Sequence, residues 1–239
     1  LITLGIIGVV AAITMPSLVA NIQDKQNIAK WKKAYSIISQ AYAQTVNEGY
    51  EPCTKEHYGC PETSVLKANK VTVYFWYDKA EAITEEFKTH FISKFNGAII
   101  CNNSNNCKTN SYIHPSKIRP KTLAGNIFPS YNWSGTRFKL PTGELIMFGG
   151  THGGPWLSVD VNGPENGPNI IGRDMFVMKL YDTSVKPMGA EGTFNPKTNG
   201  NECLCGKEYG NSGTVYFGGA SGAGEAAPGA CCSAVYLSK

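Results

Sequence analysis

The first 49 residues constrain the fold most, because they form one uninterrupted helical pattern with two different halves. Residues 1–20, LITLGIIGVVAAITMPSLVA, contain no charged side chain, and the first charge is Asp24. About 20 apolar residues is the length that crosses a bilayer as a helix. Further along, side chains suited to a buried face recur at spacings of three and four, as in an amphipathic helix: Ala34, Ile37, Ile38, Ala41, Thr45 and Val46. The pattern predicts a hydrophobic helix over 1–23 that continues as an amphipathic helix over 24–49, with Gly49 as a stop signal.

A single-span anchor joined to a separate head is the alternative interpretation of this helix. It predicts a flexible linker after the apolar run, and the sequence contains none there. Four lysines follow the run, at positions 25, 30, 32 and 33. Taken alone, the positive-inside rule would place that side of the membrane in the cytoplasm. The cysteines of the remaining chain argue for the opposite side.

Eight cysteines indicate an exported head. Disulfides persist in oxidising compartments, and short polar loops separate Cys53 from Cys60 and Cys101 from Cys107, which we expect to pair locally. The last four cysteines flank the Gly-rich segment 206–230, and we expect them to pair across it: Cys203, Cys205, Cys231 and Cys232. A zinc site built from these four is the alternative, but C-x-C and C-C spacings suit tetrahedral coordination poorly.

The remaining pattern predicts an α+β head over 50–239. Charged residues make up 17% of the chain, below the typical ~25%, as suits a loop-rich exported protein. Apolar and β-branched runs predict strands at 71–76, 136–140, 144–149, 156–161 and 174–180. A short helix is expected over 79–95, with one apolar face: Ile83, Phe87, Phe91 and Ile92. We expect an antiparallel sheet with one face packed on the amphipathic helix, and so a long helical spine beneath the sheet.

A crowded set of oxygen-bearing side chains predicts a calcium site between two of these strands. Its members are Asp160, Asn162, Asn166, Asn169 and Asp174. Calcium takes six to eight oxygen ligands, including carboxylates and carbonyls. The alternative is a turn whose Asx side chains bond to their own backbone. No other cofactor is expected.

The stretch GIIGVVAAITMPSL, with Gly8 and Pro16 eight residues apart, resembles the N-terminus of bacterial type IV pilins and type II secretion pseudopilins. The alignment makes Leu1 the seventh residue of the mature family sequence, so the processed Phe and the family's Glu would lie upstream. The block SVDVNGPENGPNIIGRDMF also resembles many pilin-like heads.

This resemblance implies a structural subunit that polymerises with copies of itself through its N-terminal helix. The filament would serve adhesion, motility, secretion or DNA uptake. The subunit would wait in the inner membrane for the prepilin peptidase and the assembly machinery, and then enter a surface pilus or a periplasmic pseudopilus. The residues expected to form the filament core are Leu1, Leu4, Ile7, Gly8, Val9, Ile13, Pro16 and Leu18.

Other functional classes find little support in the sequence. Catalytic motifs such as H-E-x-x-H, G-x-S-x-G and the Walker loop do not occur, so we do not expect an enzyme. The net charge is +4 with scattered basic residues, which is unlike a nucleic-acid-binding surface. A monomeric membrane-tethered adhesin or carbohydrate-binding protein, with the helix as a plain anchor, stays open as the second hypothesis.

Overall fold

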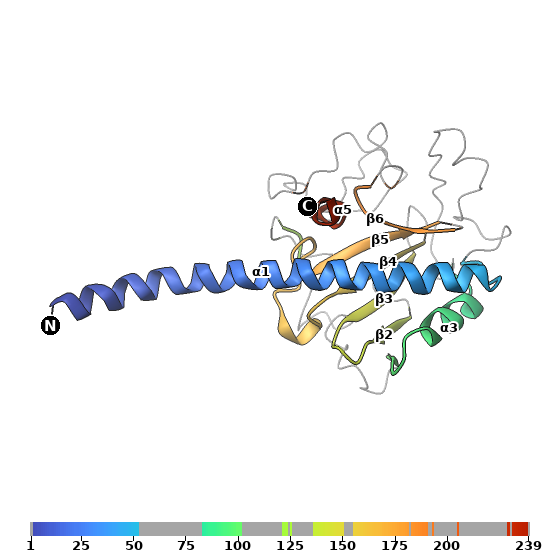
Figure 1. The fold of residues 1–239 in the computed structure, drawn as a ribbon, viewed down its shortest axis with the longest axis horizontal. Helices are drawn as coiled ribbons and strands as arrows, with labels where there is room; N and C mark the ends of the chain where they lie inside the picture. Colours follow the sequence, from blue (N-terminus) through green and yellow to red (C-terminus); the bar gives the residue numbers. More distant parts are fainter. Residues whose placement is uncertain are drawn as a thin grey trace.

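A computed structural model describes residues 2–52, 83–101, 121–123, 125, 136–150, 155–181, 183–190, 193, 205, 229 and 231–238, without the side chains of 2–11, 149, 150 and 155. Its main feature is the 46-residue helix α1 (Ile2–Asn47), which crosses the head and then projects beyond it (Figure 1). The helix ends near Gly49, which adopts a φ of +92°, a conformation that glycine adopts readily. Pro16 lies inside the helix.

The head contains a six-stranded antiparallel sheet in which every strand pairs with its neighbours in sequence. The strands are β1 (Ile99–Ile100), β2 (Arg137–Lys139), β3 (Leu145–Gly150), β4 (Pro155–Asp160), β5 (Met175–Leu180) and β6 (Val185–Pro187). The predicted α+β class and antiparallel sheet are confirmed. The short strands β1 and β6 were not predicted.

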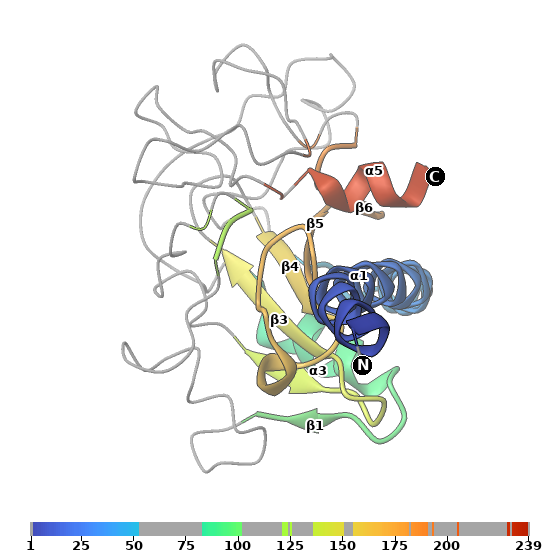
Figure 2. The same cartoon turned by 90° about the vertical axis from the view of Figure 1, so that its left-hand side faces the viewer.

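Both faces of the sheet are buried. Side chains alternate along a strand, so Phe176 and Met178 of β5 face the helices, while Met175 and Val177 join a second apolar cluster on the opposite face. On the helix side, α1 contributes five buried apolar residues: Trp31, Ala34, Ile38, Ala41 and Tyr42. Figure 2, seen along α1, shows the helix lying against one face of the sheet.

The predicted buried face of α1 needs one correction. Ile37 is 39% exposed, whereas Trp31 and Tyr42, absent from the prediction, are fully buried. Successive residues of a helix are about 100° apart. Ile37 therefore lies about 90° from the centre of the arc that holds Ala34 and Ile38, and it points past the core.

The predicted helix over 79–95 was wrong at its start. Helix α3 (Glu85–Ser93) begins after Thr84, whose side chain accepts a hydrogen bond from the Phe87 N–H and so caps the helix. The predicted apolar residues are buried: Phe87, Phe91 and Ile92 lie on α3, and Ile83 lies just before it. The predicted strand 71–76, the pair Cys53 and Cys60, and most of the Gly-rich segment lie outside the described residues.

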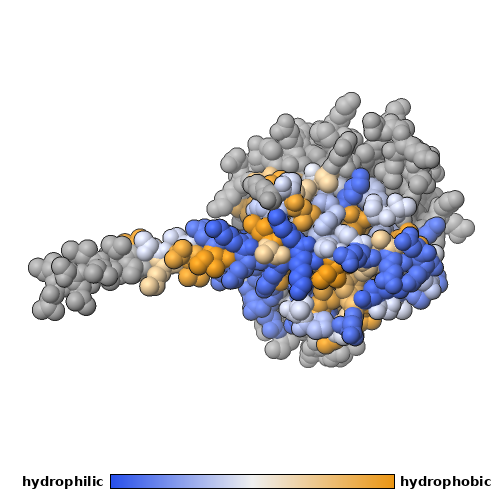
Figure 3. All heavy atoms as spheres, in the orientation of Figure 1, coloured by the Kyte–Doolittle hydropathy of each residue, from blue (hydrophilic) through white to orange (hydrophobic). Residues whose placement is uncertain are grey.

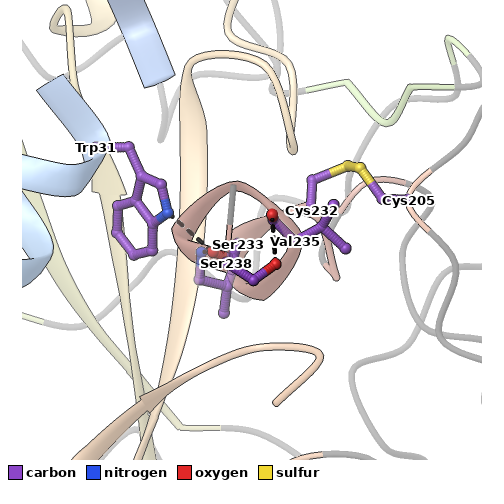
Figure 4. The surroundings of a disulfide bond; sticks show 7 residues. Trp31, Cys205, Cys232, Ser233, Val235 and Ser238 are labelled. Carbon is purple, nitrogen blue, oxygen red and sulfur yellow. Dashed lines mark hydrogen bonds between the residues drawn. A yellow bond between two sulfur atoms is a disulfide. The ribbon is translucent and has the colours of Figure 1, made fainter. Parts of the chain in front are cut away.

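A short helix not predicted from the sequence, α5 (Cys232–Ser238), joins α1 to the sheet. The Trp31 indole donates to the Ser233 carbonyl over 2.9 Å (Figure 4), and the Val177 N–H donates to the Ser233 hydroxyl over 2.9 Å. Trp31 also stacks on Phe176, with ring centroids 4.8 Å apart. One residue of α5 therefore bonds to both the long helix and the strand β5.

A disulfide between Cys205 and Cys232 holds the start of α5. It confirms one predicted link across the Gly-rich segment. Cys101 and Cys231 are disulfide-bonded as well. The remaining predicted pairings stay predictions. Near these cysteines the backbones of Gly172 and Gly229 lie in close contact. A Cβ atom added to Gly172 would lie only 2.5 Å from the Gly229 carbonyl oxygen. Only glycine fits at such a crossing.

Candidate assembly surface

The projecting part of α1 carries a row of exposed apolar side chains. Ile13 is 71% exposed, and the values for Met15, Leu18, Val19 and Ile22 are 62%, 60%, 52% and 46%. Figure 3 shows apolar atoms gathered on the helix where it leaves the head. Of the predicted filament-core residues, Ile13, Pro16 and Leu18 are exposed. The side chains of the other five lie outside the described part: Leu1, Leu4, Ile7, Gly8 and Val9.

Most of this row faces away from the head. At about 100° per residue, Met15, Leu18, Val19 and Ile22 share an arc of about 100°. The same arc continues further along the helix as the exposed residues Lys33, Ser36 and Gln40, opposite the buried Trp31 and Ile38. The four residues Met15, Leu18, Val19 and Ile22 are called the apolar stripe below. Because the head packs on the opposite side of α1, it cannot cover this stripe.

An ion pair links α1 to the head close to the point where the helix leaves it. The Arg173 Nε lies 2.6 Å from the Asp24 Oδ1, although the two residues are 149 positions apart. A groove of about 440 Å³ opens beside this pair, lined among others by Ser17, Asn21 and Tyr236. Burial, together with the nearby Asp24 carboxylate, raises the pKa of Tyr236.

The segment in which a calcium site was predicted is described, and its carboxylates accept hydrogen bonds from its own backbone. Asp160 Oδ1 accepts from the N–H groups of Asn162 and Gly163, at 3.2 and 2.8 Å. Asp174 accepts from the N–H groups of Asn169 and Ile170, at 2.8 and 2.6 Å. Hydrogen bonds of this kind are expected for the alternative interpretation, a turn whose Asx side chains bond to their own backbone. Burial still raises the pKa of the Asp174 carboxyl, because desolvation outweighs the hydrogen bonds that it accepts.

The Asn162 amide occupies the point where the oxygens of this loop converge. Its Nδ2 lies 3.0 Å from the Asn166 carbonyl, 3.2 Å from the Gly167 carbonyl and 3.4 Å from Asp174 Oδ2. A calcium ion would take such oxygens as ligands and would require the amide to turn so that Oδ1 faces it. Asn169 instead donates its side-chain N–H to the Pro164 carbonyl. Within the described residues, no three His, Cys, Asp or Glu side chains form a metal-sized group.

Sequence reasoning missed the contacts that attach α1 to the head. Trp31 lies three and seven positions before Ala34 and Ile38, so helical spacing could have placed it in the core. The link between Asp24 and Arg173 has no comparable signal, because nothing local relates two residues so far apart.

Among the residues whose side chains the structure describes, no helical segment has both the length and the apolar content of a membrane span. The function proposed below depends on this chain's own residues and their geometry. Comparisons with protein-family models, with curated proteins and with solved structures give no match.

Proposed function

We propose that the chain is a structural subunit, of the pilin or pseudopilin kind, that polymerises through α1 into a bacterial filament. One observation carries the proposal: the apolar stripe lies on a helix that projects beyond the head and on the side that the head does not cover. The resemblance of residues 5–18 to pilin N-termini supports the same function.

The apolar stripe gives a physical reason for self-association. A buried Leu, Ile, Val or Met side chain contributes about 1.5–3 kcal/mol relative to an exposed one. The four side chains of the stripe are roughly half exposed, so covering them would contribute about 3–7 kcal/mol per subunit. In a filament, each subunit both covers a neighbour and is covered by one, so the contribution is repeated along the polymer.

The proposal also says where the subunit is located before and after assembly. Before assembly the apolar part of α1 lies in the inner membrane, with the head on the oxidising side. The disulfide between Cys205 and Cys232 fits that compartment. After processing and assembly, α1 lines the core of a surface pilus or a periplasmic pseudopilus, and the head forms its outer layer.

The test places one new carboxylate at two equivalent positions of α1. Leu18 and Ser36 are 18 residues apart, which is five helical turns, so they share a face. Leu18→Asp puts a charge into the apolar stripe, and Ser36→Asp puts the same charge on the polar continuation of that face. We expect Leu18→Asp to abolish filaments released by shear, while Ser36→Asp leaves their yield unchanged.

Both variants are checked for membrane-fraction abundance and for the Cys205–Cys232 disulfide, which show that the head is intact. Normal filaments from Leu18→Asp would refute the proposal. Retention of the wild-type chain in membranes without any filaments would favour the tethered adhesin or carbohydrate-binding hypothesis.

A further inference from the structure

Four exposed lysines follow the apolar stripe along α1, at positions 25, 30, 32 and 33. They are called the basic stripe below. None of them forms an ion pair with another described residue. The neighbouring acid, Asp24, is bonded to Arg173. The basic stripe therefore presents its charge to whatever lies against this part of the helix.

An exposed acidic surface lies at the other end of the head. Glu51, Glu85 and Glu86, called the acidic end below, lie at the start of α3, where the Thr84 hydroxyl donates to the Glu51 carbonyl over 3.2 Å. Glu85 bonds to Lys88, and its side chain stays 82% exposed. Glu51 and Glu86 are exposed and have no ion pair among the described residues. Two carboxylates of this surface are thus without a cationic neighbour in the described part of their own chain.

Lys30 of the basic stripe lies on the flank of α1 that carries the acidic end, and Lys33 lies about 60° from it. Lys25 and Lys32 lie about 140–160° from Lys30, on the other side of the helix. Lys30 lies 18 residues before Glu48, the first residue after α1, which corresponds to about five helical turns and about 27 Å of rise. Glu48 bonds to Lys94, just past the end of α3, so Glu48 marks the flank on which α3 lies. A second copy that is shifted along the helix axis by about 27 Å and turned so that this flank faces the first copy would bring its Lys30 level with the acidic end of the first.

We propose that the acidic end of one subunit binds the basic stripe of the next and so sets the axial offset between neighbouring copies. The inference rests on the proposed filament function and adds to it a specific axial offset between neighbouring subunits. Apolar burial is non-directional, so the apolar stripe alone permits many offsets, whereas complementary charges select one. The contact joins two different surfaces, so it continues as an open polymer and does not close into a two-fold dimer.

A second copy explains more of the charge pattern than a lipid surface does. Anionic headgroups would also attract the four lysines. They would leave Glu51 and Glu86 without a partner. A neighbouring copy pairs both surfaces at once.

The experiment reverses each surface separately and then both together, in the full chain and in cells that assemble the wild type. One variant carries Lys30→Glu and Lys33→Glu, another carries Glu51→Lys and Glu86→Lys, and the third carries all four changes. Each single-surface variant turns two attractive pairs into repulsive ones, so we expect its shear-released filament yield to fall about tenfold. The combined variant restores opposite charges and should recover most of the wild-type yield. Lys121→Glu, at an exposed lysine outside both surfaces, is the matched control and should assemble normally.

The inference is overturned if the single-surface variants assemble normally, or if the combined variant stays as defective as they are. Sedimentation with phosphatidylglycerol vesicles identifies the lipid outcome. In that case both variants that lack Lys30 and Lys33 lose vesicle binding, and the combined variant does not recover its filaments. Failure of the filament function itself has a different signature, because the wild type and Lys121→Glu would then yield no filaments either.

Discussion

Replacing Trp31 by Phe tests whether α5 holds the long helix on the sheet. The wild-type indole is fully buried, donates to the Ser233 carbonyl over 2.9 Å and stacks on Phe176. Phenylalanine keeps an aromatic ring at this position but has no N–H and is smaller. The substitution therefore removes the hydrogen bond to α5 and leaves a small cavity beside β5.

The expected loss of stability has two parts. The missing hydrogen bond contributes about 1 kcal/mol, and the smaller ring contributes about 1–2 kcal/mol through lost contacts and residual cavity. The total is about 2–3 kcal/mol. For a chain of 239 residues this corresponds to a fall in Tm of about 5–10 °C. Trp31→Ala, which removes the ring altogether, should be worse, at about 3–5 kcal/mol.

Urea unfolding followed by circular dichroism in detergent measures the difference in free energy of unfolding. Ile37→Ala is the matched control, because Ile37 lies on the same helix and is 39% exposed. It should change the stability by no more than about 0.5 kcal/mol. If Trp31→Phe is as stable as this control, the bond to Ser233 does not hold the helix and the argument fails.

Three further predictions concern the head. Burial lowers the pKa of Lys179 to about 8, whereas the pKa of an exposed lysine is ~10.4. Between these two pH values the Lys179 side chain carries its proton in the unfolded chain but has lost it in the folded one. Stability should therefore rise with pH across this window relative to Lys179→Met, as Tm measured at pH 7 to 10 would show; parallel Tm curves would contradict it. If the Asp160–Asp174 loop binds calcium, millimolar calcium raises Tm and Asp174→Asn abolishes the rise; equal Tm in calcium and in chelator would leave only the hydrogen-bonded turn. Non-reducing peptide mapping should find Cys205 joined to Cys232, and also the pairs Cys203–Cys231, Cys53–Cys60 and Cys101–Cys107; free thiols would refute the predicted connectivity.

Strands with a strong pattern of their own were predictable. The run 174–180 contains one charged residue after Asp174, and β5 is buried on both faces. The turn residues 141–143 mark the hairpin between β2 and β3, where Gly143 has a φ of +106°. The edge strands have no such pattern. β1 is two residues long, and β6 contains Pro187, which counts against a strand on sequence grounds. Their pairing partners make them strands.

The candidate assembly surface and the candidate calcium loop were also predictable only in part. The exposure of Leu18 follows from an apolar run longer than the head could cover, whereas the direction of the apolar stripe depends on how Trp31 and Ile38 dock. In the loop, Asp160 and Asp174 both accept hydrogen bonds from Asn162. The sequence does not distinguish a calcium site from a hydrogen-bonded turn. In such turns carboxylates can accept hydrogen bonds from backbone N–H groups, and they can also coordinate calcium.

The bond between Trp31 and Ser233 spans 202 residues, and this gives the fold an order in time. A chain that emerges N-terminus first exposes Trp31 early. Its strands can pair one after another, because every strand neighbours its predecessor. The bond between α1 and α5, however, cannot form until residue 233 has emerged. Contacts such as the one between Asp24 and Arg173 can form earlier. The link from α1 to α5 is therefore the last attachment of the helix to be completed, once synthesis has passed residue 233.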